Sequence, residues 1–174
     1  MKSIRDIYKI GKGPSSSHTM GPERAAKLFL SEHPEADRIQ VILYGSLSKT
    51  GVGHGTDRVL REVLSSVDNK IIYAQEDPED MGHPNTMDFF AYQGETQTGH
   101  FRVESVGGGD IVILGRPADP NEEIYPENSF AEIADFCKWR YIHTLSEYVE
   151  MNEGPEIWDF LREVWAAMQR SISD

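Results

Sequence analysis

The 174 residues predict an α+β fold, in which helices pack against a largely antiparallel sheet and a helical segment follows at the C-terminal end. Three β-rich runs lie close together, at 86–93, 99–106 and 110–114, and strands this close in sequence form an antiparallel meander more readily than βαβ units. Earlier segments have apolar residues at helical spacing. From Ser129 onward the sequence changes to amphipathic helical patterns.

The first 45 residues are predicted to hold two helices and one strand. A short helix covers residues 3–10. A longer helix runs from Pro22 to about Glu32, with Pro22 in its first turn, where the missing N–H costs nothing. Alternating apolar residues predict a strand over 38–45, and a glycine-rich loop over 46–56 follows it.

The next helix is predicted to begin at Thr56 or Asp57, either of which can cap it, because the following apolar residues have helical spacing. Residues 70–73 form a short expected strand and 77–85 a polar loop. A turn over 94–98 is expected to join the first two strands of the meander.

A proline-containing linker is expected at 116–128, and three short helices with all three tryptophans follow it. These helices have more apolar surface than they can cover among themselves. They either pack back onto the sheet, as in many small domains, or dock against a further domain or another chain. The sequence leaves both arrangements open.

Charge and composition exclude several classes of protein. The chain has 17 Lys and Arg against 29 Asp and Glu, a formal net charge of −12, so neither nucleic acid nor an anionic membrane is an expected partner. The apolar runs are too short to span a bilayer and residues 1–12 lack the apolar core of a signal peptide, so a cytoplasmic location is expected. Cys137 is the only cysteine, which excludes an internal disulfide, and its helical setting predicts a buried structural residue.

A run of hydroxyl side chains around a histidine precedes the second helix: Gly13-Pro14-Ser15-Ser16-Ser17-His18-Thr19-Met20-Gly21-Pro22. Hydroxyl groups and free backbone N–H groups at a helix N-terminus can hold an anion, and uncharged donors suit a small carboxylate. A Ser–His nucleophile pair is disfavoured, because adjacent residues rarely face each other and no G-x-S-x-G turn is present. Taken alone, an ordinary Ser/Thr-rich turn is the simpler interpretation.

Two further histidines stand in comparable settings. His54 lies between glycines at the start of a helix, where a lightly covered imidazole should favour its neutral form and could accept a proton. His83 precedes a strand in the run His83-Pro84-Asn85-Thr86-Met87. A mononuclear metal site formed by His18, His54 and His83 is a weaker hypothesis, because their spacings match no compact metal motif. The other histidines are expected to be structural or on the surface: His33, His100 and His143.

Four motifs in this order resemble those of the bacterial iron–sulfur L-serine dehydratases (L-serine ammonia-lyases): G-P-S-S-S-H-T-M-G-P, Y-G-S-L-S-x-T-G-x-G-H-G-T-D, H-P-N-T-M and S-V-G-G-G. The resemblance covers residue 3 to about 114. It implies that residues 1–128 form the family's β domain, which is similar to the allosteric substrate-binding domain of some phosphoglycerate dehydrogenases. Residues 129–174 resemble the opening helices of the α, or catalytic, part.

The resemblance implies conversion of L-serine to pyruvate and ammonia without pyridoxal phosphate. In that family a [4Fe–4S] cluster with one open iron site acts as a Lewis acid on substrate oxygens, while a base removes the Cα proton. Carried over to this sequence, His54 is the expected base, and His18 is the alternative base or an orienting group. Substrate contacts are expected from Ser15, Ser16, Ser17, Thr19, His83 and Asn85.

The chain departs from the family at the cluster, whose cysteine ligands come from the α part. The chain is therefore expected to supply no metal ligand, to be inactive alone, and to need an α chain or α domain; a dimer is also expected. The alternative is a non-catalytic regulatory module that binds serine or a related small carboxylate. The residues leave open a preference for serine or threonine.

Overall fold

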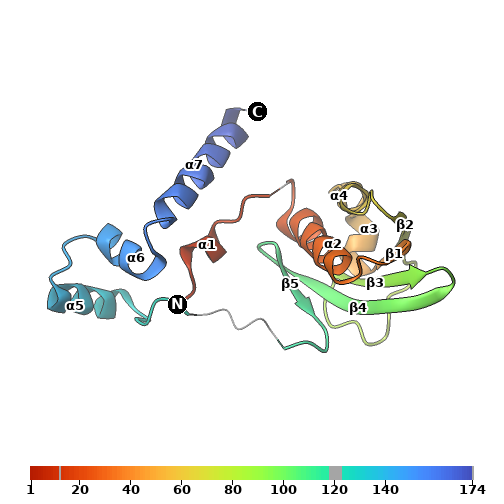
Figure 1. Cartoon of the computed structure of the whole chain (residues 1–174), viewed down its shortest axis with the longest axis horizontal. Helices are drawn as coiled ribbons and strands as arrows, with labels where there is room; N and C mark the ends of the chain where they lie inside the picture. The colour runs from red at the N-terminus through yellow and green to blue at the C-terminus, as the bar shows by residue number, and fades with distance from the viewer. Residues whose placement is uncertain (12, 118–122, 174) are drawn as a thin grey trace. The chain divides into compact units, whose positions relative to one another are not determined.

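The computed structural model of the chain describes residues 1–11, 13–117 and 123–173. These residues divide into two compact units, Gly11–Ala118 and Met1–Ile10 with Asp119–Asp174 (Figure 1). The first ten residues therefore group with the C-terminal helices, which the sequence does not predict. The boundary between family domains at 128/129 stays a prediction.

The larger unit is built on a five-stranded sheet of order β2-β1-β3-β4-β5. Strands β3 (Thr86–Gln93), β4 (Thr96–Gly107) and β5 (Asp110–Ile113) form the predicted antiparallel meander, and β1 (Arg38–Leu43) pairs antiparallel with β3. Strand β2 (Asp68–Tyr73) runs parallel to β1 across a helical connection. The predicted α+β fold with a largely antiparallel sheet is confirmed.

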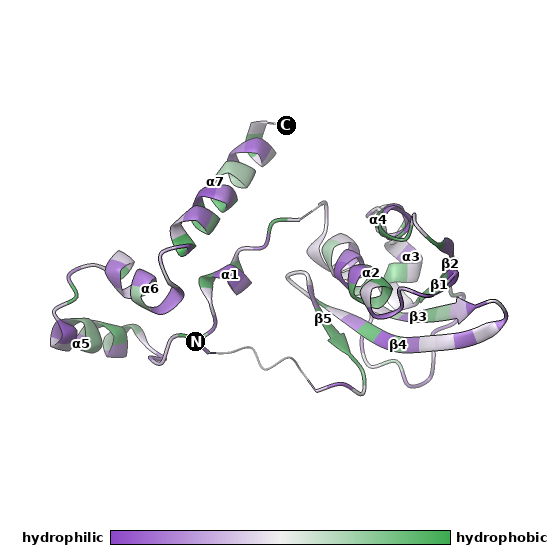
Figure 2. Ribbon diagram, in the orientation of Figure 1, coloured by the Kyte–Doolittle hydropathy of each residue, from purple (hydrophilic) through white to green (hydrophobic). Residues whose placement is uncertain are grey.

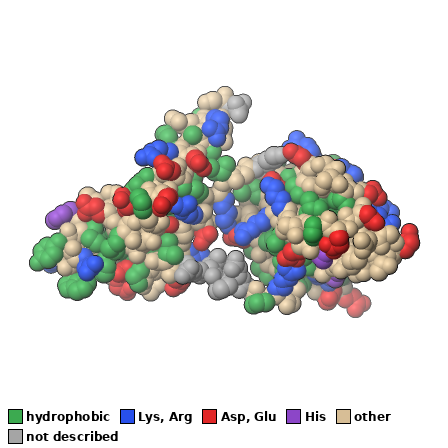
Figure 3. Space-filling view, in the orientation of Figure 1, with side chains coloured by type: hydrophobic (Ala, Val, Ile, Leu, Met, Phe, Trp, Pro, Cys, Tyr) green, Lys and Arg blue, Asp and Glu red, His purple; other side chains and the backbone are tan. Residues whose placement is uncertain are grey.

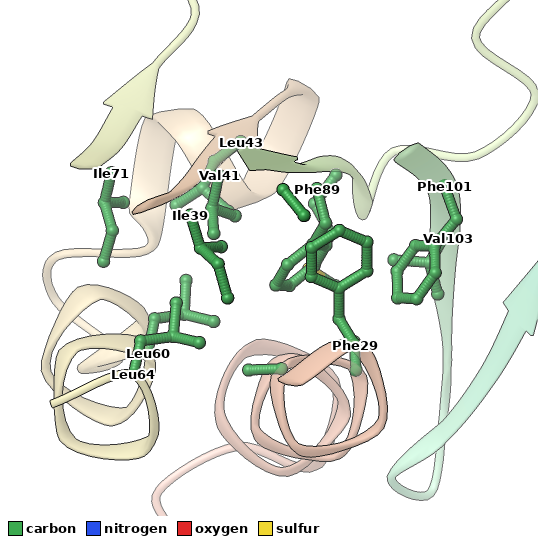
Figure 4. Close-up of a cluster of buried hydrophobic side chains, with 14 of the residues drawn as sticks. Phe29, Ile39, Val41, Leu43, Leu60, Leu64, Ile71, Phe89, Phe101 and Val103 are labelled. Carbon is green, nitrogen blue, oxygen red and sulfur yellow. The ribbon is translucent and has the colours of Figure 1, made fainter. Parts of the chain in front are cut away.

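Two helices, α2 (Gly21–Glu32) and α4 (Thr56–Val63), cover one face of this sheet. Figure 4 shows Phe29 of α2 pointing at the strands, and its ring centroid lies 4.7 Å from that of Phe101 and 5.4 Å from that of Phe89. Every second residue of β1 is buried against these helices, as expected for a strand with one covered face. Each large apolar side chain buried in this way contributes about 1.5–3 kcal/mol relative to exposure.

The connection between β1 and β2 differs from the predicted glycine-rich loop over 46–56, because it begins with a short helix, α3 (Gly45–Thr50). Gly45 has a φ of +52°, which glycine adopts without strain, and a Cβ there would clash with the Pro84 carbonyl oxygen. The predicted cap of α4 is also wrong. Gly55, with a φ of +69°, precedes that helix, and no side chain caps it.

Several other boundaries differ from the sequence prediction, two of them by several residues. Strand β4 begins at Thr96, so the turn after β3 holds only Gly94 and Glu95 instead of residues 94–98. Helix α1 (Ile4–Ile7) is shorter than the predicted helix over 3–10.

The smaller unit joins α1 to three helices, α5 (Phe130–Arg140), α6 (Leu145–Glu153) and α7 (Ile157–Ser173). The Glu153 carboxylate of α6 accepts hydrogen bonds from the Ile4 N–H at 2.6 Å, the Ser3 hydroxyl at 2.7 Å and the Tyr125 hydroxyl at 2.8 Å. One carboxylate therefore holds the first residues of the chain to the helices that follow residue 129.

Many apolar side chains of the smaller unit stay exposed. Figure 2 shows hydrophilic and hydrophobic residues alternating along α7, and Figure 3 shows hydrophobic side chains gathered over the α5 end of the unit. The largest exposed fractions belong to Ile7 (71%), Phe130 (69%), Trp139 (71%), Tyr141 (83%), Trp165 (62%) and Ile172 (86%). An apolar pocket of about 340 Å³ lies between α1, α5 and α6. Cys137 is partly exposed, so its predicted burial is wrong. None of the described helices is long and apolar enough to cross a membrane.

Candidate functional site

The hydroxyl-rich run forms one π-helical turn, η1 (Ser16–Met20), which continues directly into α2. The Ser15 hydroxyl accepts from the His18 N–H at 3.2 Å, and the Ser15 carbonyl oxygen accepts from the Thr19 N–H at 2.9 Å. These two amides are used within the turn and are not free to hold an anion. The turn presents its side chains instead.

The imidazole rings of His18 and His54 lie side by side. Their centroids are 4.8 Å apart and their planes are tilted by 50°. His18 comes from η1 and His54 from the turn between α3 and α4, and both side chains are partly exposed. The two motifs thus contribute to one place on the larger unit, while the chemical role of each histidine stays a prediction.

Two buried threonines fasten the two motifs to each other. The Thr19 hydroxyl donates to the His54 carbonyl oxygen at 2.9 Å, and the Thr56 hydroxyl donates to the His18 carbonyl oxygen at 2.6 Å. Thr19 is 1% exposed and Thr56 is fully buried. Each histidine is therefore held through its own backbone by the other motif, an arrangement that we call the threonine clasp.

Replacing Thr56 by valine should lower the free energy of unfolding by about 1–3 kcal/mol, because the shape is kept while the His18 carbonyl oxygen loses its partner. Urea denaturation of the full chain measures this. Ser31→Ala removes an exposed hydroxyl of α2 that donates to the Leu28 carbonyl oxygen, and it should change the stability by less than about 0.5 kcal/mol. Equal losses in the two variants would contradict the structural importance of the clasp.

Both ring nitrogens of His18 are engaged by serine hydroxyls. Ser17 Oγ lies 3.0 Å from Nδ1, and Ser46 Oγ lies 3.0 Å from Nε2. The expectation that adjacent Ser and His side chains do not face each other is wrong here, because the π-turn brings Ser17 onto the ring. Among the residues that the structure describes, the His18 ring meets no carboxylate of the kind that orients the histidine of a catalytic triad.

The ring of His54 is open by comparison. Within the residues that the structure describes, neither of its nitrogens has a hydrogen-bond partner, and the ring contacts that of His18. The His54 backbone is held separately, through its N–H and its carbonyl oxygen. An imidazole nitrogen without a partner is available to a proton or a ligand.

Burial lowers the pKa of His18 below 6.5, and the neighbouring His54 lowers it further. The unfolded chain then binds a proton at a higher pH than the folded chain, so protonation favours unfolding. The contribution of His18 to stability is complete above about pH 6.5 and is lost as the pH falls through its folded-state pKa.

This pH dependence is measurable. An NMR titration should give His18 a pKa below 6.5, and urea denaturation should show lower stability at about pH 5.5 than at about pH 7.5. His18→Gln should remove part of this dependence. An unchanged dependence in the variant would assign it to other groups.

The third motif adjoins the first two. The Pro84 carbonyl oxygen accepts from the Ser46 N–H at 2.7 Å, and the His83 Nδ1 accepts from the Asn85 N–H at 3.1 Å. The Asn85 side-chain N–H donates to the Ser105 carbonyl oxygen at 3.4 Å. Ser105 begins the S-V-G-G-G motif and packs against Gly21, where a Cβ would clash with its hydroxyl. All four motifs therefore meet.

Two buried polar atoms at this junction have no partner among the described residues, Asn85 Oδ1 and Ser105 Oγ. A buried acceptor without a partner is costly, so such atoms indicate a place where a small polar ligand could bind. Ser105 and Ser46 are the site residues that the sequence analysis misses. Their partners lie far away in the sequence, and the only available signal is their position inside two of the four motifs.

The predicted substrate contacts are placed as follows. Ser15 and Ser17 are partly buried beside His18, and Ser16 is exposed. The Thr19 hydroxyl is used in the threonine clasp, where it donates to the His54 carbonyl oxygen. His83 and Asn85 lie in the loop that leads into β3.

The chain's own residues do not fit an iron–sulfur cluster. Across residues 1–11, 13–117 and 123–173, no three His, Cys, Asp or Glu side chains are arranged to hold a metal ion, so His18, His54 and His83 do not form such a group. A [4Fe–4S] cluster needs several thiolates, and this chain has only Cys137 in α5.

A buried ion pair, which the sequence does not predict, lies next to the second motif. Asp88 of β3 is 2% exposed and accepts two hydrogen bonds of 2.9 Å from the Arg102 guanidinium. It also accepts from the Tyr44 hydroxyl at 3.0 Å and lies 3.4 Å from His100 Nε2. Burial, followed by the Asp88 charge, raises the pKa of Tyr44 to about 12. The ion pair thus holds Tyr44, the residue before Gly45, in place.

Comparison with known proteins agrees with the motif order. Residues 3–69 match the family described as "Serine dehydratase beta chain". The chain is 31% identical to L-serine dehydratase 1 and 30% identical to L-serine dehydratase 2 of Escherichia coli, each over 221 aligned residues that cover 99% of this chain and 48% of the relative. L-serine dehydratase of Haemophilus influenzae is 48% identical over 63 residues, which are 33% of this chain and 14% of that protein.

These matches define the class of protein that the chain resembles, the β part of the L-serine dehydratases, which is the family that the motifs indicate. Residues 3–69 belong to the serine dehydratase β chain family, and the similarity to the two E. coli proteins runs over nearly the whole chain. It spans about half the length of the E. coli relatives that it matches.

Proposed function

We propose that this chain is the β part of an L-serine ammonia-lyase that converts L-serine to pyruvate and ammonia together with an α part. The observation that carries the proposal is the contact of the His18 and His54 rings, 4.8 Å apart, within the residues that match the family. A pair of adjacent imidazoles, one held and one open, suits proton abstraction next to a carboxylate.

In the proposed reaction an open nitrogen of His54 accepts the Cα proton of L-serine. Loss of the β-hydroxyl then gives an enamine, which hydrolyses to pyruvate and ammonia. His18 orients the open imidazole from its place between Ser17 and Ser46. The α part would supply a [4Fe–4S] cluster as the Lewis acid, and no pyridoxal phosphate is involved.

The polar atoms around the two rings supply contacts for a small amino acid. Asn85 Oδ1 and Ser105 Oγ, which are buried and without partners, could accept from the substrate ammonium group. The exposed hydroxyl of Ser16 could donate to its carboxylate, beside the hydroxyls of Ser15 and Ser17, which contact each other and the His18 ring. His83 lies next to these contacts, because its Nδ1 accepts from the Asn85 N–H.

The exposed apolar side chains of the smaller unit support the need for an α part. Phe130, Trp139 and Trp165 are each more than half exposed, and exposed apolar patches of this kind mark interaction sites. We expect the α part to cover this unit, the assembly to contain two copies of the chain, and the protein to act in the cytoplasm.

The proposal is tested by combining the chain with an α part. The chain is co-expressed with the part of E. coli L-serine dehydratase 1 that it does not match, and the purified complex is loaded with iron and sulfide without oxygen. Pyruvate should form from L-serine only when both parts are present. A loaded complex that forms no pyruvate would contradict the proposal.

The regulatory alternative predicts a different result. Asn85 Oδ1 and Ser105 Oγ, the two candidate ligand contacts, are both supplied by this chain. A regulatory module would therefore bind L-serine without an α part. Calorimetry on the isolated chain measures this. Tight binding, combined with an inactive loaded complex, would favour the regulatory module.

A further inference from the structure

The two serines that contact His18 decide which of its nitrogens carries the proton. A neutral imidazole has one N–H donor and one bare acceptor nitrogen. Ser17 Oγ at Nδ1 and Ser46 Oγ at Nε2, each 3.0 Å away, must therefore play opposite roles. One hydroxyl donates to the ring, and the other accepts from it.

The neighbouring hydroxyls favour one of the two arrangements. Thr50 donates its proton to the Ser46 carbonyl oxygen at 2.8 Å, so it can only accept from the Ser46 hydroxyl, which is 3.5 Å away. If Ser46 accepts from the ring, it can pass its own proton toward Thr50. On the opposite side Ser15 Oγ lies 3.5 Å from Ser17 Oγ and can donate to Ser17, which then donates to Nδ1.

The arrangement with the proton on Nε2 uses every one of these contacts in a single direction, from Ser15 to Thr50. With the proton on Nδ1, Ser46 must donate to the ring and its contact with Thr50 is lost. Aligned hydrogen bonds polarise and strengthen one another, which favours the complete chain.

We propose that Ser46 is a positioning residue, whose hydroxyl accepts from the Nε2–H of His18 and holds this ring in one tautomer beside His54. His18 then has no bare nitrogen to offer a substrate, because Ser17 occupies Nδ1, whereas both nitrogens of His54 stay open. The base is therefore His54. That last assignment rests on the proposed function, but the tautomer of His18 does not.

NMR of the imidazole nitrogens tests the tautomer in the full chain without partner or substrate. His18 should be mainly in the Nε2–H form. In Ser46→Ala, Nε2–H should cease to be the major form, because Ser17 can accept from Nδ1–H once Nε2 has no partner. Ser46→Thr keeps the hydroxyl and should keep the wild-type tautomer.

Ser48→Ala is the matched control. Ser48 lies on the same helix, α3, and its hydroxyl donates to the Ala74 carbonyl oxygen at 2.7 Å instead of to His18. This variant also loses one hydrogen bond, yet it should leave the tautomer of His18 unchanged. A wild-type Nδ1–H form, or the same tautomer in wild type and Ser46→Ala, would overturn the proposal.

The reconstituted complex gives the second measurement. Ser46→Ala should lower the rate of pyruvate formation roughly 10- to 100-fold, as expected when a catalytic group loses its orientation. Ser48→Ala should stay close to wild type. An inactive wild-type complex whose His18 has the expected tautomer would contradict the proposed function and leave the role of Ser46 standing.

Discussion

Replacing Arg102 by methionine should lower the free energy of unfolding by about 3–5 kcal/mol. Asp88 is 2% exposed and takes two hydrogen bonds from this guanidinium, so the variant leaves a buried carboxylate without its main partner. Methionine fills a similar volume, which limits the effect to the lost charge. Urea denaturation followed by far-UV circular dichroism measures the change.

Two further variants separate this effect from a general loss of an arginine. Arg24 pairs with Asp110 at 2.9 Å, but both side chains are more than half exposed, so Arg24→Met should cost at most about 1 kcal/mol. Adding Asp88→Asn to Arg102→Met should recover part of the loss, because no charge is then left buried. A double variant as unstable as Arg102→Met, or more so, would show that packing and not the charge sets the cost.

Replacing His54 by glutamine should lower the rate of pyruvate formation in the reconstituted complex by about 10²- to 10⁴-fold, the contribution of a positioned base. Glutamine keeps polarity and approximate size but cannot accept the Cα proton. The His54 carbonyl oxygen, which accepts from Thr19, is kept, so the fold and the association with the α part should be unaffected.

A spectrophotometric pyruvate assay, with co-purification of the two parts as a check on assembly, measures this effect. His143→Gln is the control, because this histidine is exposed in the smaller unit and should be replaceable without loss. Wild-type turnover in His54→Gln would move the base role to another group.

Local patterns predict most of the fold. Alternation of apolar residues predicts strand β1, and the close spacing of β3, β4 and β5 predicts the meander. The parallel pairing of β2 is missed because it depends on the path of the connection. Helix α3 is missed because its support is not local: Ser48 donates to the Ala74 carbonyl oxygen and the Gly45 N–H to the Asp77 carboxylate at 2.7 Å.

The candidate site divides in the same way. The glycines around His18 and His54 indicate that these two histidines are candidate site residues, because each motif is continuous in sequence. The partners that hold them are not predictable from spacing, since Ser46 is 28 positions from His18 and Arg102 is 14 positions from Asp88. The residue types in a motif indicate which reaction chemistry is possible, but the groups that orient the two histidines are brought there only by tertiary packing.

The threonine clasp has a consequence for transplanting this site to another scaffold. Each motif donates a hydroxyl proton to the histidine carbonyl oxygen of the other, so neither segment carries all that its own imidazole needs. Grafting either segment alone would deliver a histidine with an unanchored backbone. The two segments form an indivisible module that must be moved, or diversified in a library, as one piece.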